Sequence, residues 1–272
     1  RTMSKEDLNV AIDWAAQEGW NPGLYDLDAF FEADPNGYLI GELDNKPVAT
    51  VSVVAYDNTF GFLGFYIVKE EFRGKGYGLK LWQEGLKYLG NRNIGLDGVI
   101  AQQENYKKSG FKFAYRNIRY EGIAENYDLR NTLELKYIAF NDLLKFDNKM
   151  FPVSRPAFLK QWIEQPESFA RAVIIDNKLQ GYGMLRKCRS GYKIGPLFAE
   201  NNLIAEDLLI DLIRNIPGKK YYYDTPEVNA AAVSLAKKYN MNMVFETARM
   251  YTRQKPELPT DKIFGVTTFE LG

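Results

Sequence analysis

Histidine is absent from all 272 residues of the chain, and Cys188 is its only cysteine. Without histidine the protein has no Ser-His-Asp triad, no Cys-His pair and no His-ligated metal. A single cysteine excludes an internal disulfide and a cysteine-rich zinc site, and it agrees with a reducing compartment. We therefore expect no metal site and none of these hydrolytic mechanisms.

Long apolar runs and an excess of one charge are also missing. No run approaches the ~18 apolar residues of a membrane span, and the N-terminal RTMSKEDLNV does not resemble a signal peptide. The 35 Lys+Arg residues balance 35 Asp+Glu residues. Dispersed basic residues without net positive charge argue against a nucleic-acid partner. We expect a soluble, cytoplasmic protein that binds neither membranes nor nucleic acids.

The chain repeats itself. Residues 35–53 and 166–184 each read as two strands joined by an Asp-Asn-Lys turn, and residues 109–120 resemble residues 239–251. Both pairs recur after about 130 residues, in an order of helices and alternating strands that is typical of two similar α+β units. A chance similarity between two hairpins is the alternative interpretation. The charged stretch at residues 120–131 predicts the boundary between the two units. The first unit is then residues 1–125, and the second is residues 130–272.

The segment FGFLGFYIV, residues 60–68, predicts an aromatic strand. Its glycines, Gly61 and Gly64, indicate a bulge or a close approach by another backbone segment. A helix follows, and Gly90 is placed to end it. The apolar face of that helix is predicted from its three- and four-residue spacing, and it consists of Leu79, Trp82, Leu86 and Leu89.

Three glycines at alternate positions, Gly74, Gly76 and Gly78, lie between this strand and this helix. Such a loop can curl so that several N–H groups point inward, and the helix N-terminus adds its positive dipole end. Arg73 and Lys75 add fixed positive charge. We therefore predict a phosphate or diphosphate site; a turn that merely begins a helix is the alternative. The glycine spacing fits neither a nucleotide P-loop nor a dinucleotide fingerprint.

Two motifs resemble the GNAT (Gcn5-related N-acetyltransferase) family. The run Arg73-Gly74-Lys75-Gly76-Tyr77-Gly78 is similar to the R/Q-x-x-G-x-G/A loop of that family, and NYKKSGF, residues 105–111, is similar to its Tyr-x-x-x-Gly-Phe helix end. The duplicated layout, with EGWNPG near the start and IFGVTTFELG at the close, resembles tandem GNAT proteins. This resemblance implies tandem GNAT folds, each a mixed, mostly antiparallel sheet flanked by helices.

The resemblance also implies acetyl-CoA as cosubstrate and assigns the residues that bind it. The pantetheine arm would bind backbone groups of Tyr66, Ile67 and Val68. The diphosphate would bind the N–H groups of Arg73, Gly74, Lys75, Gly76, Tyr77 and Gly78. Tyr106 falls where many family members place the general acid for the departing thiolate, and a phenol of pKa ~10 stays protonated for that task. A tyrosine that only packs the helix onto the sheet is the alternative.

The implied reaction is direct attack of a small primary amine on the thioester in a ternary complex. Neutralising an alkylamine at pH 7 costs roughly 4.6 kcal/mol, so a base is needed. Glu18 is the first candidate, because EGWNPG would border the acceptor pocket of a GNAT fold. Asp28 and Asp97 are the alternatives, and each of the three could instead be a solvated carboxylate or helix cap. An acyl-enzyme is disfavoured, because Cys188 lies in the other unit.

The second unit departs from the pattern. Its counterpart of the glycine loop, residues 195–209, has no glycine triplet and carries Glu200 and Glu206 where a phosphate would lie. Its counterpart of Tyr106 is Ala236. We predict that only the first unit binds acetyl-CoA and that the second walls off the acceptor pocket, which favours a small acceptor. A CoA-binding regulator or scaffold without turnover, or a transferase using another acyl-CoA or a hydroxyl acceptor, remain alternatives.

Overall fold

A computed structural model describes all of residues 1–272. The first half contains α1 (Leu8–Gln17), α2 (Asp26–Ala33), β1 (Tyr38–Leu43), β2 (Lys46–Ala55), β3 (Phe60–Val68), η1 (Glu70–Phe72), α3 (Tyr77–Leu89), β4 (Asn93–Val99), η2 (Ile100–Gln102), α4 (Gln103–Lys108) and β5 (Lys112–Ile123). The second half contains β6 (Leu133–Glu134), η3 (Leu135–Tyr137), α5 (Phe140–Met150), α6 (Pro156–Ile163), β7 (Ser168–Ile175), β8 (Lys178–Lys187), β9 (Tyr192–Ala199), α7 (Asn202–Ile213), β10 (Lys220–Pro226), α8 (Ala230–Lys238), β11 (Asn242–Tyr251), η4 (Thr260–Lys262) and β12 (Ile263–Gly265).

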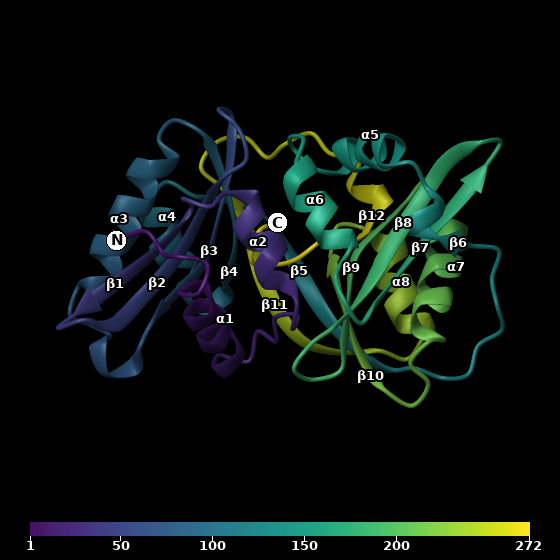
Figure 1. The fold of residues 1–272 in the computed structure, drawn as a ribbon, viewed down its shortest axis with the longest axis horizontal. Coiled ribbons are helices and arrows are strands. Elements are labelled where there is room, and N and C mark those ends of the chain that lie inside the picture. Colours follow the sequence, from purple (N-terminus) through teal and green to yellow (C-terminus); the bar gives the residue numbers. More distant parts are fainter.

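All strands belong to one twelve-stranded sheet that runs through both halves (Figure 1). Its order is β1-β2-β3-β4-β11-β5-β10-β9-β8-β7-β6, with β12 paired to β9. Most pairs are antiparallel, whereas β3–β4 and β9–β10 are parallel. The predicted α+β class with mixed, mostly antiparallel sheets flanked by helices is therefore confirmed. No helix has the length and apolarity to cross a membrane.

Strand β5 of the first half and strand β11 of the second half are exchanged. Strand β11 from the second half lies between β4 and β5, with Thr247 opposite Val99 on one side and opposite Asn117 on the other. Strand β5 from the first half in turn pairs with β10 of the second half. Each half thus supplies a central strand that the other half needs for its sheet. The stretch predicted as the boundary, residues 120–131, begins in the last four residues of β5, and residues 124–132 form no helix or strand.

We expect neither half to fold when it is expressed without the other. A fragment of residues 1–128 would leave β5 without both of its neighbours and would expose the unpaired edge of β4, which favours aggregation. The check is a thermal melt followed by circular dichroism: residues 1–128 and 129–272 should each lack a cooperative transition, and coexpression should restore it. A cooperative melt of either fragment alone would contradict this expectation and would support two autonomous units.

The repeated hairpins are confirmed in detail. Asp44 and Asn45 have φ values of 49° and 60°, and their counterparts Asp176 and Asn177 have φ values of 52° and 58°. Two successive positive φ angles define the tight turn that best matches the twist of paired antiparallel strands, and Asp and Asn tolerate that conformation. The same short sequence therefore produces the same hairpin in both halves.

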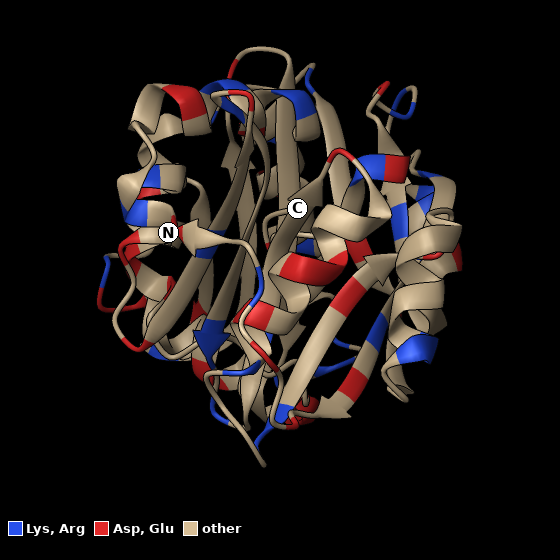
Figure 2. Ribbon diagram, turned by 90° about the vertical axis from the view of Figure 1, so that its right-hand side faces the viewer, with Lys and Arg blue, Asp and Glu red and all other residues tan.

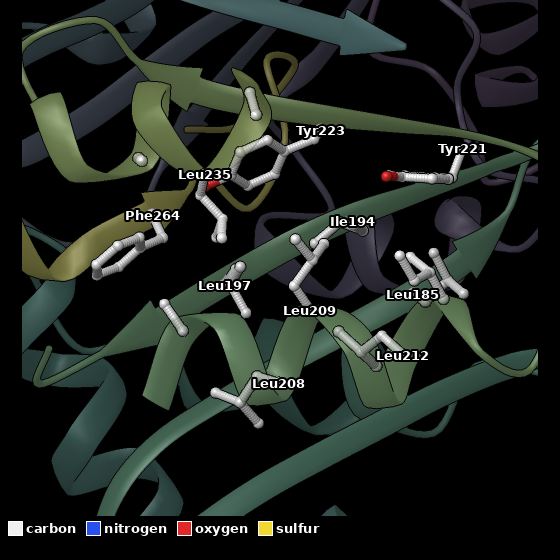
Figure 3. Packing of buried hydrophobic residues seen from close by; sticks show 14 of the residues in the cluster. Leu185, Ile194, Leu197, Leu208, Leu209, Leu212, Tyr221, Tyr223, Leu235 and Phe264 are labelled. Carbon is white, nitrogen blue, oxygen red and sulfur yellow. The ribbon is translucent and has the colours of Figure 1, made fainter. Parts of the chain in front are cut away.

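Helix α3 ends where the sequence predicts, because Gly90 adopts a φ of 58° after its last turn. Trp82 and Leu89 lie in the core with Leu81, and Leu86 packs against that core. The prediction is wrong for Leu79, which is 57% exposed and lines a cavity instead. In the second half, the apolar side chains of α7 pack onto β8 and β9, and Figure 3 shows Leu209 near Ile194 and Leu197 and Leu212 beside Leu185.

Charged residues of both signs are interspersed over the surface (Figure 2), but the interface between the halves contains buried ion pairs. Arg119 of β5 pairs with Asp224 of β10 through two hydrogen bonds of 2.7 Å. Arg186 of β8 pairs with Asp26 of α2. Because a buried charge that loses its partner is strongly destabilising, these pairs penalise any other arrangement of the halves.

The C-terminal segment, residues 266–272, returns from the second half to the first. Its Val266 N–H donates to Asp224 O at 2.9 Å, and Tyr56 of the first half donates to Leu271 O at 2.9 Å. All seven residues of the segment are buried. The segment thus crosses the middle of the molecule and ends against β3.

Candidate active site

An opening between β3 and β4 forms the centre of the candidate site. The two strands pair only from Phe60–Asn93 to Leu63–Leu96 and then diverge. Past that point β4 continues to pair with β11, whereas the facing edge of β3 has no strand partner. Unpaired backbone groups along a strand edge can bind an extended ligand, as an added strand would.

Three residues are predicted to bind the pantetheine arm through their backbone, and the backbone groups of two of them face this opening. Lys69 N–H donates to Val48 O at 3.0 Å, and the antiparallel register then directs the backbone groups of Ile67 toward Thr50 of β2. The direction of the backbone groups alternates along a strand, so those of Tyr66 and Val68 face β4. The expectation for Ile67 therefore differs from the geometry, because its N–H and C=O lie on the paired edge.

Strand β3 bends at the point where it leaves β4. Its pairing with β2 shifts between Thr50 and Ser52, and Phe65 has an unusual positive φ of 45°. A bulge of this kind redirects the strand beside a functional site. The expected close approach also occurs here, since a Cβ on Gly64 would lie 2.1 Å from the backbone oxygen of Glu270. Both features that Gly64 predicted are present, and the approaching backbone belongs to the C-terminal segment.

The glycine loop has the curled conformation that its sequence predicts. Gly74 and Gly76 have φ values of 75° and 80°, and neither has an atom within 4 Å of where a Cβ would stand. Helix α3 begins directly after Gly76 and has no side-chain cap, so the N–H groups of its first turn lack partners. Gly78 packs so closely on Tyr66 and Val68 that a Cβ would meet both within 2.7 Å. An uncapped helix N-terminus beside a glycine loop suits a phosphate group.

Arg73 organises the start of this loop. The backbone N–H of Arg73 donates to Glu70 O at 3.1 Å. It is therefore not available to bind a diphosphate, which differs from the prediction. Its side chain donates from Nε to Val68 O at 2.9 Å and from Nη2 to Glu18 Oε1 at 2.6 Å. Both side chains remain partly exposed at the cavity mouth. Glu18 thus lines the cavity paired with Arg73 at the glycine loop, and its role as a base at the acceptor stays a prediction.

Tyr106 of α4 lines the same cavity. Its ring stacks on Trp82 with centroids 5.6 Å apart and lies so close to Gly98 that a Cβ there would be 2.1 Å from Cε2. Burial, and to a lesser degree the nearby Tyr66, raises the pKa of Tyr106 to about 12. The side chain is 8% exposed. The phenol is therefore held rigidly and in its protonated form.

The other two candidate bases differ in position. Asp97 lines the cavity, yet its carboxylate accepts from Arg249 Nη2 at 2.6 Å and from Asn117 Nδ2 at 2.8 Å. Burial raises the pKa of Asp97, and Arg249 opposes that shift. Asp28 lies on the surface, paired with Lys5 at 2.7 Å. Asp28 is not among the cavity residues, and it is too exposed to be part of this site.

The cavity has a volume of about 550 Å³ and joins the glycine loop, the strand opening and Tyr106. Four of its residues come from the second half of the chain and were not predicted individually; they are Phe245, Thr247, Phe269 and Glu270. The first pair reaches the cavity because β11 is exchanged, and the second pair because the C-terminal segment returns to β3. In the sequence, Phe269 and Glu270 belong to the closing motif IFGVTTFELG, and Phe245 and Thr247 belong to the repeated segment 239–251.

The corresponding opening in the second half is filled. Strands β9 and β10 pair only from Tyr192–Tyr221 to Ile194–Tyr223, and β12 then pairs with β9 at Leu197 and Phe198. The N-terminus of α7 is also occupied, because Asn201 Oδ1 accepts from Leu203 N and Ile204 N. This geometry leaves no strand edge and no uncapped helix turn of the kind seen in the first half.

Comparisons with known proteins agree with this duplication. Residues 6–111 match the acetyltransferase (GNAT) family, and residues 143–265 match an acetyltransferase (GNAT) domain. Holothin acyltransferase from Pseudoalteromonas sp. (strain SANK 73390) is 32% identical over 275 residues, which span 100% of this chain and 94% of that protein.

Two solved structures share the fold along nearly the whole chain. A proposed acetyltransferase from Pyrococcus horikoshii has a TM-score of 0.85 at 23% identity and covers 100% of this chain and 95% of its own. A tandem GNAT protein from the clavulanic acid biosynthesis pathway has a TM-score of 0.64 at 9% identity and covers 93% of this chain and 98% of its own. Proteins of this family use acyl-CoA. The chain therefore belongs to the GNAT family, as an acyltransferase built from two GNAT units in tandem.

Proposed function

We propose that this protein transfers an acetyl group from acetyl-CoA to the primary amine of a small acceptor, with the reaction confined to the first unit. The observation that carries the proposal is the single cavity that joins the uncapped glycine loop, the open edge of β3 and Tyr106. The loop N–H groups from Gly74 to Gly78 bind the diphosphate of the cosubstrate. Backbone groups of Tyr66 and the N–H of Val68 bind its pantetheine arm, because Val68 O already accepts from Arg73 Nε.

The cosubstrate supplies an activated thioester, and the protein supplies position and a proton. The acceptor nitrogen attacks the carbonyl carbon directly, without a covalent acyl-enzyme. Cys188 is buried in the second half and is absent from the cavity wall, and burial raises its pKa, so it is a poor nucleophile. Tyr106 donates its proton to the departing thiolate, as a rigidly held general acid.

A small acceptor is favoured because the cavity is walled on the acceptor side. Phe245 and Phe269 from the second half line the cavity, and in this proposal they form the wall that excludes a protein tail. The same apolar wall, with Leu63 and Phe65, could hold an acyl group longer than acetyl. Transfer of a longer acyl group is therefore the second candidate.

The test is thiol release from acetyl-, propionyl- and succinyl-CoA over a panel of amines, amino acids, polyamines, aminoglycosides and alcohols. We expect release from acetyl-CoA with at least one small primary amine and none with the matching alcohol. Faster release from propionyl-CoA would instead support the longer acyl group. Tight acetyl-CoA binding without release for any acceptor would contradict the proposal and would favour a binding protein without turnover.

A further inference from the structure

Glu270 is a buried carboxylate that faces the cavity and that the proposed reaction has not used. The side chain is 3% exposed, and it lines the cavity with Phe269, Thr247 and Asp97. Thr268 Oγ1 donates to its Oε2, and no other hydrogen bond reaches the carboxylate. Oε1 is left without a partner. Buried carboxylates are costly unless they are paired, so an unpaired oxygen at a cavity wall indicates a binding group for a ligand.

The cations near Glu270 do not provide that missing partner. Charges on Arg119 of β5, Arg186 of β8 and Lys193 of β9 interact with it. Arg119 is already bound to Asp224 and to Trp20 O, and Arg186 is bound to Asp26. Lys193 is buried and donates only to Trp20 O, at 3.3 Å, and burial lowers its pKa. None of the three donates a hydrogen bond to Glu270.

The position of Glu270 relative to the loop matters for the chemistry. The backbone of Glu270 lies against Gly64, at the end of the opening that adjoins the paired part of β3 and β4. The glycine loop lies at the other end of β3. A ligand whose diphosphate binds the loop and whose arm follows the edge of β3 therefore ends in the part of the cavity that Glu270 lines. Tyr106, beside Gly98 of β4, faces the same cavity.

We propose that Oε1 of Glu270 binds the amino group of the acceptor and takes up its proton, so that a segment of the second unit completes the active site of the first. This inference rests on the proposed amine acetylation. It selects acceptors that are ammonium ions in solution, because an ammonium group supplies the charged hydrogen-bond donors that Oε1 lacks. The aromatic rings of Phe245 and Phe269 flank the body of such an acceptor.

The reaction releases one proton overall. The ammonium gives one proton to Glu270 and becomes a neutral amine. Its nitrogen forms a bond to the carbonyl carbon, the C–S bond breaks, and the thiolate takes the hydroxyl proton of Tyr106. The surplus proton on the new amide nitrogen returns to Tyr106, and Glu270 releases its proton to water. The products are an amide, a free thiol and one proton.

Binding provides the first test, with the full-length protein saturated with CoA, which carries no acyl group to transfer. The probes are phenethylammonium and phenethyl alcohol, measured by calorimetry at neutral pH. We expect the wild-type protein to bind the ammonium at least about tenfold more tightly than the alcohol. Glu270→Gln should remove that preference and leave alcohol binding unchanged. A wild-type protein without the preference, or a variant that keeps it, overturns the inference.

Kinetics provide the second test, with acceptors that differ in basicity. For an alkylamine, Glu270→Gln should lower kcat/KM by about 10²-fold or more, the usual contribution of a general base. For methoxyamine, which is neutral at pH 7 and needs no deprotonation, the loss should be much smaller. KM for acetyl-CoA should not change. Equal losses with both nucleophiles, together with a lower Tm, would show a structural role and overturn the inference.

Glu84→Gln is the matched control, because Glu84 is an exposed carboxylate on α3 that pairs only with Lys87. It should behave as the wild-type protein does in both tests. The two proposals fail differently. If the wild-type protein acetylates no amine, the proposed function fails while the calorimetric preference still reports on Glu270. If the wild-type protein acetylates amines and Glu270→Gln does so with unchanged amine dependence, only the assignment of Glu270 fails.

Discussion

Replacing Gly76 with valine should abolish acetyl-CoA binding, with an increase in Kd of about 100-fold or more. Gly76 has a φ of 80°, which a β-branched residue adopts only with strain. No atom lies within 4 Å of the added Cβ, so the effect comes from the backbone rather than from a clash within the protein. Once the loop relaxes, the N–H groups of residues 74–78 no longer converge on one anion. Calorimetric titration with acetyl-CoA measures the loss.

Gly218 provides a matched control for this substitution. It has a φ of 74° and equally open surroundings, but it lies in the second unit, outside the cavity. Gly218→Val should therefore carry a similar backbone strain and lower the Tm to a similar extent, while acetyl-CoA binding stays at the wild-type level. If Gly76→Val binds acetyl-CoA normally, the diphosphate lies elsewhere.

Tyr106→Phe should lower kcat by about 10²- to 10⁴-fold, the range expected for loss of a general acid, while the Kd for acetyl-CoA stays nearly unchanged. Phenylalanine retains the ring that stacks on Trp82 and packs on Gly98, so the variant removes only the hydroxyl. Steady-state thiol release gives kcat, and calorimetry gives the affinity. Equal losses in kcat and affinity would assign Tyr106 a packing role.

The pH dependence offers a second check on Tyr106. Because burial raises its pKa to about 12, the proton-donating form persists below that value and is lost only as the pH rises toward it. We therefore expect no fall in kcat as the pH passes the ordinary tyrosine pKa of ~10. A falling limb there would contradict the assignment. Tyr120→Phe is the control, since that tyrosine on β5 is equally buried, at 8% exposure, and lies outside the cavity.

The sequence contained most of what depends on neighbouring residues. The Asp-Asn turns, the curled loop at Gly74 and Gly76 and the end of α3 at Gly90 all follow from backbone preferences that act over a few residues. The placement of Tyr106 beside the opening followed from the family motif. None of these features depends on contacts with distant parts of the chain.

The features that the sequence did not predict depend on contacts between distant residues. The sequence of β11 does not specify which strands it pairs with, so it cannot show that the strand is exchanged. Glu18 was expected as a base, but whether a carboxylate pairs with Arg73 or with a substrate depends on their final separation. Glu270 approaches Gly64 across more than 200 residues of chain, and no local pattern indicates such a contact.

The exchange of β5 and β11 has a consequence for synthesis on the ribosome. The sheet of the first unit cannot close until β11, at residues 242–251, has been translated. At ~5–20 residues per second, the first unit waits on the order of ten seconds after β5 emerges. Throughout that interval the edges of β4 and β5 are exposed to other nascent chains. The active site, which also needs residue 270, is completed only when translation of this sequence is almost finished.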